Sequence, residues 1–148
     1  MIKNKALKTV LFASAVLMVA LTGCAKKESK PAEDLTINLW SFTDEVPGMV
    51  DKYIAAHPDC GFKVNTTIIA TTDGAYQPAL DQALQAGGKD APDMYTAEAA
   101  FILKYSKGDM QDYAMPYKDL GIDVAAKVKA ADIAGYTVDI GSNTKGEL

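Results

Sequence analysis

Between positions 35 and 105, the spacing of hydrophobic residues changes several times from every second residue to every third or fourth residue. The first spacing is typical of β-strands and the second of amphipathic α-helices. The pattern therefore predicts alternating strands and helices. In chain order they are a strand at Leu35–Trp40, a helix from about Asp44 to Ala56, a strand at Phe62–Ile69, a helix from about Ala75 to Ala86, a short strand at Asp93–Thr96, and a helix that turns Phe101, Ile102 and Tyr105 inward.

Three further elements have a predicted buried face. That face of the first helix consists of Val46, Met49, Val50, Tyr53 and Ile54. In the second strand it consists of Phe62, Val64, Thr66 and Ile68, and in the second helix of Tyr76, Leu80, Ala83 and Leu84. Pro58 lies just past the first helix and Gly87-Gly88 ends the second, as expected from the conformations of proline and glycine.

After position 107 the pattern is less regular. We expect an irregular stretch from Gly108 to Leu120, a helix near Asp123–Ile133 and a strand at Tyr136–Ile140. Alternating strands and helices are typical of a parallel sheet joined by right-handed crossovers. The predicted fold class is therefore α/β, with a parallel sheet flanked by helices.

The first 23 residues have a different pattern. Residues 1–8 are cationic, and residues 9–21 form an uncharged apolar run that ends in Thr22 and Gly23. This order predicts a secretory signal peptide at 1–23. A transmembrane helix is the alternative, but the uncharged stretch from Thr9 to Ala25 is at the lower limit of the roughly 20 residues that span a bilayer.

Leu21-Thr22-Gly23-Cys24 resembles the lipobox of bacterial lipoproteins. The resemblance implies that Cys24 takes a diacylglyceryl group and becomes the first residue after cleavage, with acyl chains that anchor the protein. The alternative is an ordinary buried or free cysteine. If Cys24 is lipidated, residues 24–34 consist of the lipidated cysteine and a polar tether. We therefore predict that the protein is exported and lipid-anchored, on the extracytoplasmic face of the cell membrane or in the periplasm.

Composition fits a soluble globular domain at 35–148. The chain has 148 residues, of which 49% are hydrophobic and 23% charged. Removal of the signal with Lys3, Lys5 and Lys8 changes the formal net charge from −4 to −7. Such acidity argues against a nucleic-acid partner and against a polybasic membrane patch. Neutral or cationic small ligands remain open.

In a parallel sheet, ligands bind beyond the carboxyl ends of the strands. The three loops at those ends carry hydroxyls, carboxylates and aromatic rings, which suit a polyol because carboxylates accept hydrogen bonds and aromatic faces pack on a sugar ring. The candidate ligand-binding residues are Trp40, Thr43, Asp44, Glu45, Asp73 and Glu98.

Each candidate also has a structural interpretation. Trp40 can be a core residue at a strand end. Asp44, Glu45 and Glu98 can be placed at helix N-termini for favourable electrostatics, and Asp73 before Gly74 can be a turn or cap residue. No single residue therefore establishes a ligand site. The convergence of three loops on one edge is the feature that favours one.

Other chemistries have less support in the sequence. It contains no G-x-S-x-G elbow, P-loop or G-x-G-x-x-G. His57 is the one histidine and is expected at a helix C-terminus, and Cys60 lacks a disulfide partner once Cys24 is lipidated. We expect no metal and no cofactor. Paired carboxylates for glycoside hydrolysis could come from Asp44, Glu45, Asp73 and Glu98, an alternative that stays open.

Several segments resemble extracellular solute-binding proteins of the carbohydrate ABC-transporter type. They are the lipobox, the strand Leu35–Trp40 followed by Asp44-Glu45 and an amphipathic helix, Lys63-Val64-Asn65, and Ala91-Pro92-Asp93-Met94-Tyr95. Members of that family are bilobal, close around a sugar or oligosaccharide and deliver it to a membrane permease.

The resemblance implies a periplasmic-binding-protein-like fold of which 35–148 is an incomplete first lobe. It implies first-lobe ligand contacts from the loop Trp40–Glu45, the loop around Asp73, and Glu98. It also implies a carbohydrate ligand, permease subunits as partners and no enzymatic activity. A surface carbohydrate-active enzyme and a solute receptor that feeds a sensor are the alternatives.

Overall fold

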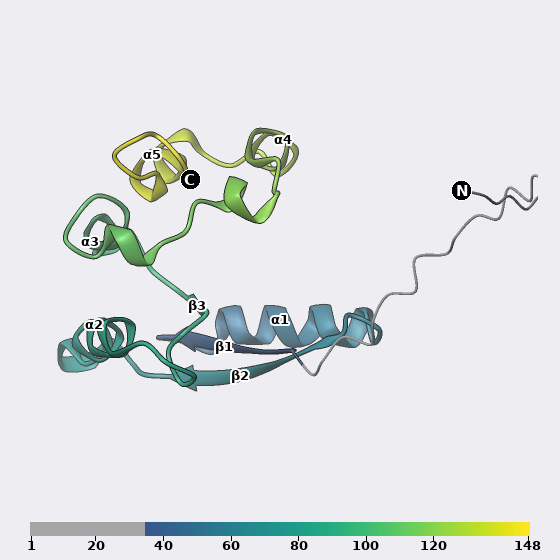
Figure 1. The fold of residues 1–148 in the computed structure, drawn as a ribbon. Coiled ribbons are helices and arrows are strands. Elements are labelled where there is room, and N and C mark those ends of the chain that lie inside the picture. Colours follow the sequence, from purple (N-terminus) through teal and green to yellow (C-terminus); the bar gives the residue numbers. More distant parts are fainter. Residues whose placement is uncertain (1–34) are drawn as a thin grey trace, which may run out of the picture. The chain divides into compact units, whose positions relative to one another are not determined.

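The computed structural model describes residues 35–148. The predictions of a signal peptide at 1–23, of lipidation at Cys24 and of a tether at 24–34 lie outside the described residues. The fold of the described part is a small parallel sheet with helices packed on it (Figure 1).

The sheet has three strands in the order β2-β1-β3. They are β1 (Leu35–Ser41), β2 (Phe62–Ile68) and β3 (Met94–Tyr95). Both pairings are parallel, with Leu39 opposite Thr66 on one side and Met94 on the other. The predicted α/β class with a parallel sheet is confirmed, and the first strand of the chain occupies the centre.

Helices connect these strands, as the periodicity predicts. The first connection contains α1 (Glu45–Ala56), and the second contains a 3-10 turn, η1 (Thr72–Gly74), and α2 (Tyr76–Ala86). After β3 comes α3 (Ile102–Ser106). The first crossover runs from β1 to β2, and the second runs back across β1 from β2 to β3, so the two have opposite directions. Right-handed crossovers of opposite direction lie on opposite faces of a sheet.

The core lies on the face of the sheet that carries Trp40 and Tyr95. Its buried members come from α2, α3 and the turn that follows, and are Tyr76, Leu80, Leu84, Phe101, Tyr105 and Met110. Phe42 meets the rings of Tyr76 and Phe101 edge-on, with centroids 5.5 and 5.8 Å apart. The predicted inward positions are confirmed except at Ala83 and Ile102, which are half-buried. Aromatic pairing joins this cluster to the end of β1.

The buried face of α1 is narrower than predicted. Met49 and Tyr53 are 57% and 52% exposed, whereas Pro47 is buried and Val46, Val50 and Ile54 are half-buried. In β2 the exposure of Thr66 and Ile68 is also a correction, because Thr67 and Ile69 are the half-buried residues at that end. A single helix on a three-stranded sheet covers a narrow strip, so residues beside the strip contact water.

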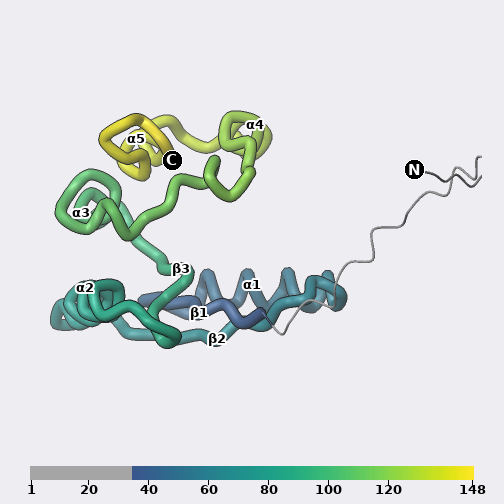
Figure 2. The backbone as a smooth tube through the Cα atoms, viewed as in Figure 1, coloured from purple at the N-terminus to yellow at the C-terminus, as the bar shows by residue number. Residues whose placement is uncertain are grey.

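The last third of the described chain consists of short helices joined by bends, as the backbone trace in Figure 2 shows. They are η2 (Gln111–Tyr113), η3 (Tyr117–Leu120), α4 (Val124–Ala130) and α5 (Gly135–Gly141). Asp123 caps α4 by accepting a hydrogen bond from the Ala126 amide at 3.0 Å. The irregular stretch and the helix near 123–133 are confirmed.

The predicted strand at Tyr136–Ile140 is wrong, because these residues form α5. The apolar residues at 136, 138 and 140 alternate as in a strand, but a strand needs a neighbour for its backbone groups and a helix supplies its own bonds. The end of α5 packs against α3, where Ser106 Oγ donates to the Ile140 carbonyl at 2.7 Å and Lys107 Nζ to the Asp139 carbonyl at 2.8 Å. These bonds satisfy carbonyls that a helix end leaves open.

Within residues 35–148, none of the helices combines the length and the apolar character needed to cross a membrane.

Candidate functional site

The carboxyl ends of the three strands lie at one edge of the sheet because all three strands are parallel. Backbone bonds continue the pairing past the strand ends, with the Ile69 amide 2.9 Å from the Ser41 carbonyl and the Thr96 amide 3.0 Å from the Trp40 carbonyl. The loops that leave this edge are residues 42–44, 69–75 and 96–101. The predicted candidates are on these loops or beside them.

Five of the six candidates are exposed at this edge, namely Thr43, Asp44, Glu45, Asp73 and Glu98. No hydrogen bond or ion pair within the described residues joins any two of them. The parallel topology brings the three loops to one edge. Because the charged groups are not paired with one another, they remain available to a ligand in solution.

Asp44 and Glu45 begin α1. Asp44 is the N-cap residue, but its side chain makes no capping hydrogen bond, and its carbonyl accepts from the Gly48 amide at 2.9 Å. Glu45 is the acidic residue of the first turn. A favourable interaction with the helix dipole remains a sufficient structural reason for both, while a side-chain cap is excluded for Asp44.

Asp73 adopts a left-handed backbone conformation, with φ 55° and ψ 20°, and Gly74 follows with φ 71°. The Gly74 amide donates to the Thr71 carbonyl at 2.9 Å, so the segment is a tight turn after β2. Aspartate tolerates this conformation better than most residues. The turn interpretation of Asp73 is confirmed, and the turn leaves the carboxylate exposed.

Trp40 is half-buried and packs against the core cluster. Its carbonyl accepts from Thr96 and, at 3.4 Å, from the Tyr76 hydroxyl. The structural interpretation of Trp40 as a residue at the edge of the core is therefore confirmed. Its role as a ligand contact stays a prediction.

Glu98 is exposed in the loop before α3, and its carbonyl accepts from the Phe101 and Ile102 amides at 3.0 and 2.8 Å. The backbone of Glu98 is thus fixed by the start of the following helix, while the carboxylate faces water.

Hydroxyl groups of buried Ser41 and Tyr76 and half-buried Thr96 are hydrogen-bonded at the same edge, and this network was not predicted from the sequence. Thr96 Oγ1 lies 3.3 Å from Ser41 Oγ, and the Tyr76 hydroxyl donates to the Thr96 carbonyl at 2.8 Å. Burial raises the pKa of Tyr76 above its ordinary value, so this hydroxyl keeps its proton and remains a donor. The sequence did contain one indication, because Ser41 continues the alternation of Leu35, Ile37 and Leu39.

The strand order makes the space between β1 and β3 a topological switch point. The chain leaves β1 toward α1 and leaves β3 toward α3, and these connections diverge because the order reverses there. Open parallel sheets bind ligands at such points. Thr43, Asp44 and Glu98 are on the two diverging loops.

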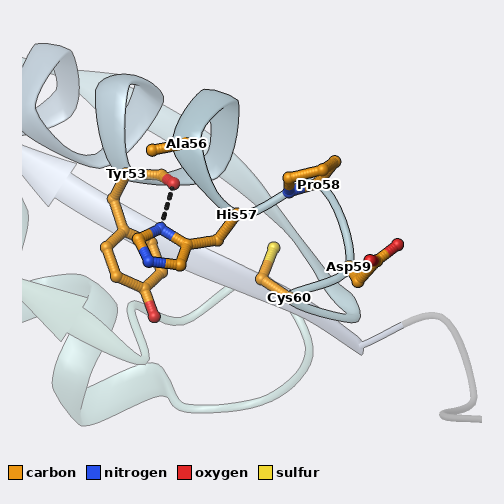
Figure 3. Close-up of a pocket in the computed structure, with 6 residues that line it drawn as sticks. All are labelled: Tyr53, Ala56, His57, Pro58, Asp59 and Cys60. Carbon is orange, nitrogen blue, oxygen red and sulfur yellow. Dashed lines mark hydrogen bonds between the residues drawn. The ribbon is translucent and has the colours of Figure 1, made fainter.

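Two open hollows lie elsewhere on the described surface. One, of about 390 Å³, is lined by Tyr53, Ala56, His57, Pro58, Asp59 and Cys60, and the other, of about 440 Å³, lies between residues 111–119 and 143–147. In the first, the imidazole of His57 stacks on the Tyr53 ring at 4.1 Å, and Nδ1 is 2.8 Å from the Tyr53 carbonyl (Figure 3). This arrangement terminates α1, and the predicted position of His57 at a helix end is confirmed.

Cys60 is half-buried and lies beside His57 (Figure 3). Its Sγ is 3.7 Å from the Phe62 carbonyl. Among residues 35–148, no group of three or more His, Cys, Asp or Glu side chains is arranged to hold a metal ion. The hollow is also at the amino end of β2, away from the edge where parallel sheets bind ligands. It therefore gives no support to a metal site.

Comparison of the chain with protein-family models, with curated proteins and with solved structures finds no match.

Proposed function

We propose that this chain is the lipid-anchored substrate-binding component of an ABC importer for a sugar or oligosaccharide. The observation that carries the proposal is the convergence of exposed Thr43, Asp44, Glu45, Asp73 and Glu98 on the carboxyl edge of a parallel sheet. In this proposal the described residues are one lobe of a periplasmic-binding-protein-like fold, and the ligand lies at the β1–β3 switch point.

The chemistry of this edge suits a hydroxylated ligand. A carboxylate offers several acceptor sites and can bind two neighbouring hydroxyl groups of a sugar. The adjacent Trp40 is half-buried, and its exposed part offers apolar surface for the C–H face of the sugar ring. We infer binding and not catalysis, because the loops supply exposed hydrogen-bond acceptors and the sequence resembles solute-binding proteins.

Delivery to a permease requires the protein to be outside the cytoplasm and held at the membrane. The order of cationic residues, apolar run and Leu21-Thr22-Gly23-Cys24 supports export and lipidation. Two or more acyl chains hold a soluble domain stably, whereas one chain binds only marginally. The proposed partners are therefore the carbohydrate, the permease subunits and, through the lipid anchor, the membrane.

Calorimetry with glucose, galactose, maltose, cellobiose and maltotriose tests ligand binding. We expect saturable binding of at least one sugar, and a loss of affinity of tenfold or more in Asp44→Asn and in Glu98→Gln, since a hydrogen bond to a charged group contributes about 1.5–3 kcal/mol. Asp51→Asn is the matched control, because Asp51 is an exposed acid within α1, away from the sheet edge. Absence of binding by all five sugars argues against the proposal, and release of reducing ends supports a glycoside-active enzyme instead.

Membrane fractionation tests the anchor. We expect Cys24→Ser to leave the membrane fraction and to lose incorporation of labelled fatty acid. The control is Cys60→Ser, which removes the other cysteine and is expected to remain membrane-bound. Equal membrane association of the two variants would contradict lipidation at Cys24.

A further inference from the structure

Three loops of the proposed site meet on one group of hydroxyls, in which Ser41 and Tyr76 are buried and Thr96 is half-buried. Ser41 belongs to the end of β1, Tyr76 to the start of α2 after the β2 loop, and Thr96 to the start of the loop after β3. We propose that Ser41, Thr96 and Tyr76 are positioning residues that hold the loops carrying Thr43 and Glu98 in the arrangement that binds ligand. This inference rests on the proposed function.

The hydrogen bonds define the arrangement. Ser41 Oγ is 3.3 Å from Thr96 Oγ1 and also accepts from the Thr43 amide at 3.3 Å. It therefore connects the start of one ligand loop with the start of another. The Tyr76 hydroxyl adds the third loop by donating to the Thr96 carbonyl at 2.8 Å and approaching the Trp40 carbonyl at 3.4 Å.

Burial separates this role from direct ligand contact. Ser41 and Tyr76 are each 1% exposed, so a ligand at the edge does not reach their side chains. Buried polar groups are costly to leave without partners, so few alternative arrangements of these hydroxyls are stable. A network of this kind lowers the entropy lost on binding because the loops are ordered beforehand.

The position of the Ser41–Thr96 bond in the sheet supports the same role. The Ser41–Thr96 bond crosses from β1 to the chain leaving β3, which is where the two connections diverge. Loss of this bond removes a side-chain link between the loops, while the backbone bond from Thr96 to Trp40 remains. We therefore expect looser loops in a protein that is still folded.

The variants separate positioning from general stability. Ser41→Ala and Thr96→Val remove the cross-strand bond, and Thr96→Ser keeps the hydroxyl. Ser106→Ala is the matched control, because Ser106 is also a buried serine, and its hydroxyl donates to the Ile140 carbonyl instead of joining two ligand loops. If Thr96→Val fails to fold, Tyr76→Phe tests the same network through the third loop.

Hydrogen exchange of the unliganded 148-residue chain measures positioning without reference to any sugar. We expect exchange to rise at least fivefold in Ser41→Ala and Thr96→Val at the hydrogen-bonded amides of the two loops, which are those of Thr43, Thr96, Phe101 and Ile102, and to stay unchanged in Thr96→Ser and Ser106→Ala. Unchanged exchange at these amides in all variants overturns the inference. A similar rise in Ser106→Ala also overturns it, because the effect would then be one of global stability.

Calorimetry with the tightest-binding sugar of the five above completes the test. We expect affinity to fall at least fivefold in Thr96→Val and to remain near wild type in Thr96→Ser and Ser106→Ala. Faster loop exchange with unchanged affinity overturns the positioning role in binding. Failure of the wild-type chain to bind any of the five sugars is a different result, because it overturns the proposed function while the exchange data still report whether the network orders the loops.

Discussion

Tyr95 differs from the other tyrosines of the core in its hydrogen bonding. Its hydroxyl is buried and has no partner among residues 35–148, whereas the Tyr105 hydroxyl donates to Asp81 at 2.9 Å. Asp81 also bonds Lys104, so Tyr105 belongs to a charged group that joins α2 and α3. The two neighbouring rings, with centroids 5.5 Å apart, therefore have different energetic roles.

Phenylalanine substitutions measure this difference. We expect Tyr95→Phe to leave the free energy of unfolding unchanged or to raise it by up to about 1 kcal/mol, because an unsatisfied buried hydroxyl is removed. Tyr105→Phe is expected to lower it by about 1.5 kcal/mol or more, because a bond to a charged carboxylate is lost. Urea unfolding compares the two, and a larger loss in Tyr95→Phe than in Tyr105→Phe would show that the interpretation is wrong.

Because of the same tyrosines, we expect the stability of the fold to depend on pH in the alkaline range. Burial is the main cause that raises the pKa of Tyr95 to about 12, from an ordinary value of 10.0, and burial with the bond to Asp81 also raises the pKa of Tyr105. A raised folded pKa gives stability that is complete below pH 10 and is lost as pH rises toward the folded pKa. We expect a lower thermal midpoint at pH 11 than at pH 9, and a smaller difference in Tyr95→Phe; an equal difference in that variant would contradict the assignment.

At the scale of residues, the sequence predicted which side chains are exposed at the sheet edge better than which are buried there. Thr43, Asp44 and Glu98 follow directly from the ends of the strands and helices. The Ser41–Thr96 bond depends on pairing between residues 55 positions apart, which local spacing does not encode. Trp40 illustrates the same limit, since its packing against α2 depends on tertiary structure.

Among the elements, β3 is the shortest strand and has side-chain support at its start. The Asp93 carboxylate accepts from the Asn38 amide at 2.8 Å, and the Asp93 amide donates to the Asn38 carbonyl at 2.9 Å. The Asn38 side chain also donates to the carbonyls of Lys89 and Ala91. The Ala91-Pro92-Asp93 segment thus has a structural role in joining β3 to the central strand.

Two aspartates of this connection give a matched test. We expect Asp93→Ala to lower the free energy of unfolding by about 1.5–3 kcal/mol, the range for a lost bond to a charged group. Asp90→Ala is expected to change it by less than about 0.5 kcal/mol, because Asp90 forms an exposed ion pair with Lys89. Guanidinium unfolding distinguishes them, and similar losses in both would argue against the Asp93–Asn38 bond as a stabilising contact.

The elements up to α3 were predictable because each has a clear period and a clear end. Gly87, for example, has φ 62° and stops α2 where the glycine pair predicts. The prediction failed at 136–140, where five residues are too few to distinguish a strand from a helix by spacing. It was also inaccurate for α1, because periodicity gives the direction of an apolar face and not the width that a neighbouring sheet can cover.

At the scale of the whole described chain, the part after α3 depends more on hydrogen bonds than on a hydrophobic core. Several of its large apolar side chains are exposed, among them Tyr113, Met115, Tyr117, Leu120 and Tyr136. The ends of this part are held by the Tyr117 amide, which donates to the Leu148 carbonyl at 2.9 Å, and by an ion pair between Lys118 and Glu147. The sequence predicted its irregularity but not these contacts between distant segments.

The central position of β1 has a consequence for the order of folding. Asn38 bonds Asn65, 27 positions away, and Asp93, 55 positions away. Doubling the length of a closed loop adds only about 0.6 kcal/mol of entropic cost, so thermodynamics places little penalty on the second pairing. Kinetics differ, because pairings distant in sequence form slowly. The strand made first must therefore wait for residues near 93 to be made before its second edge is covered, and until then that edge remains open to other chains.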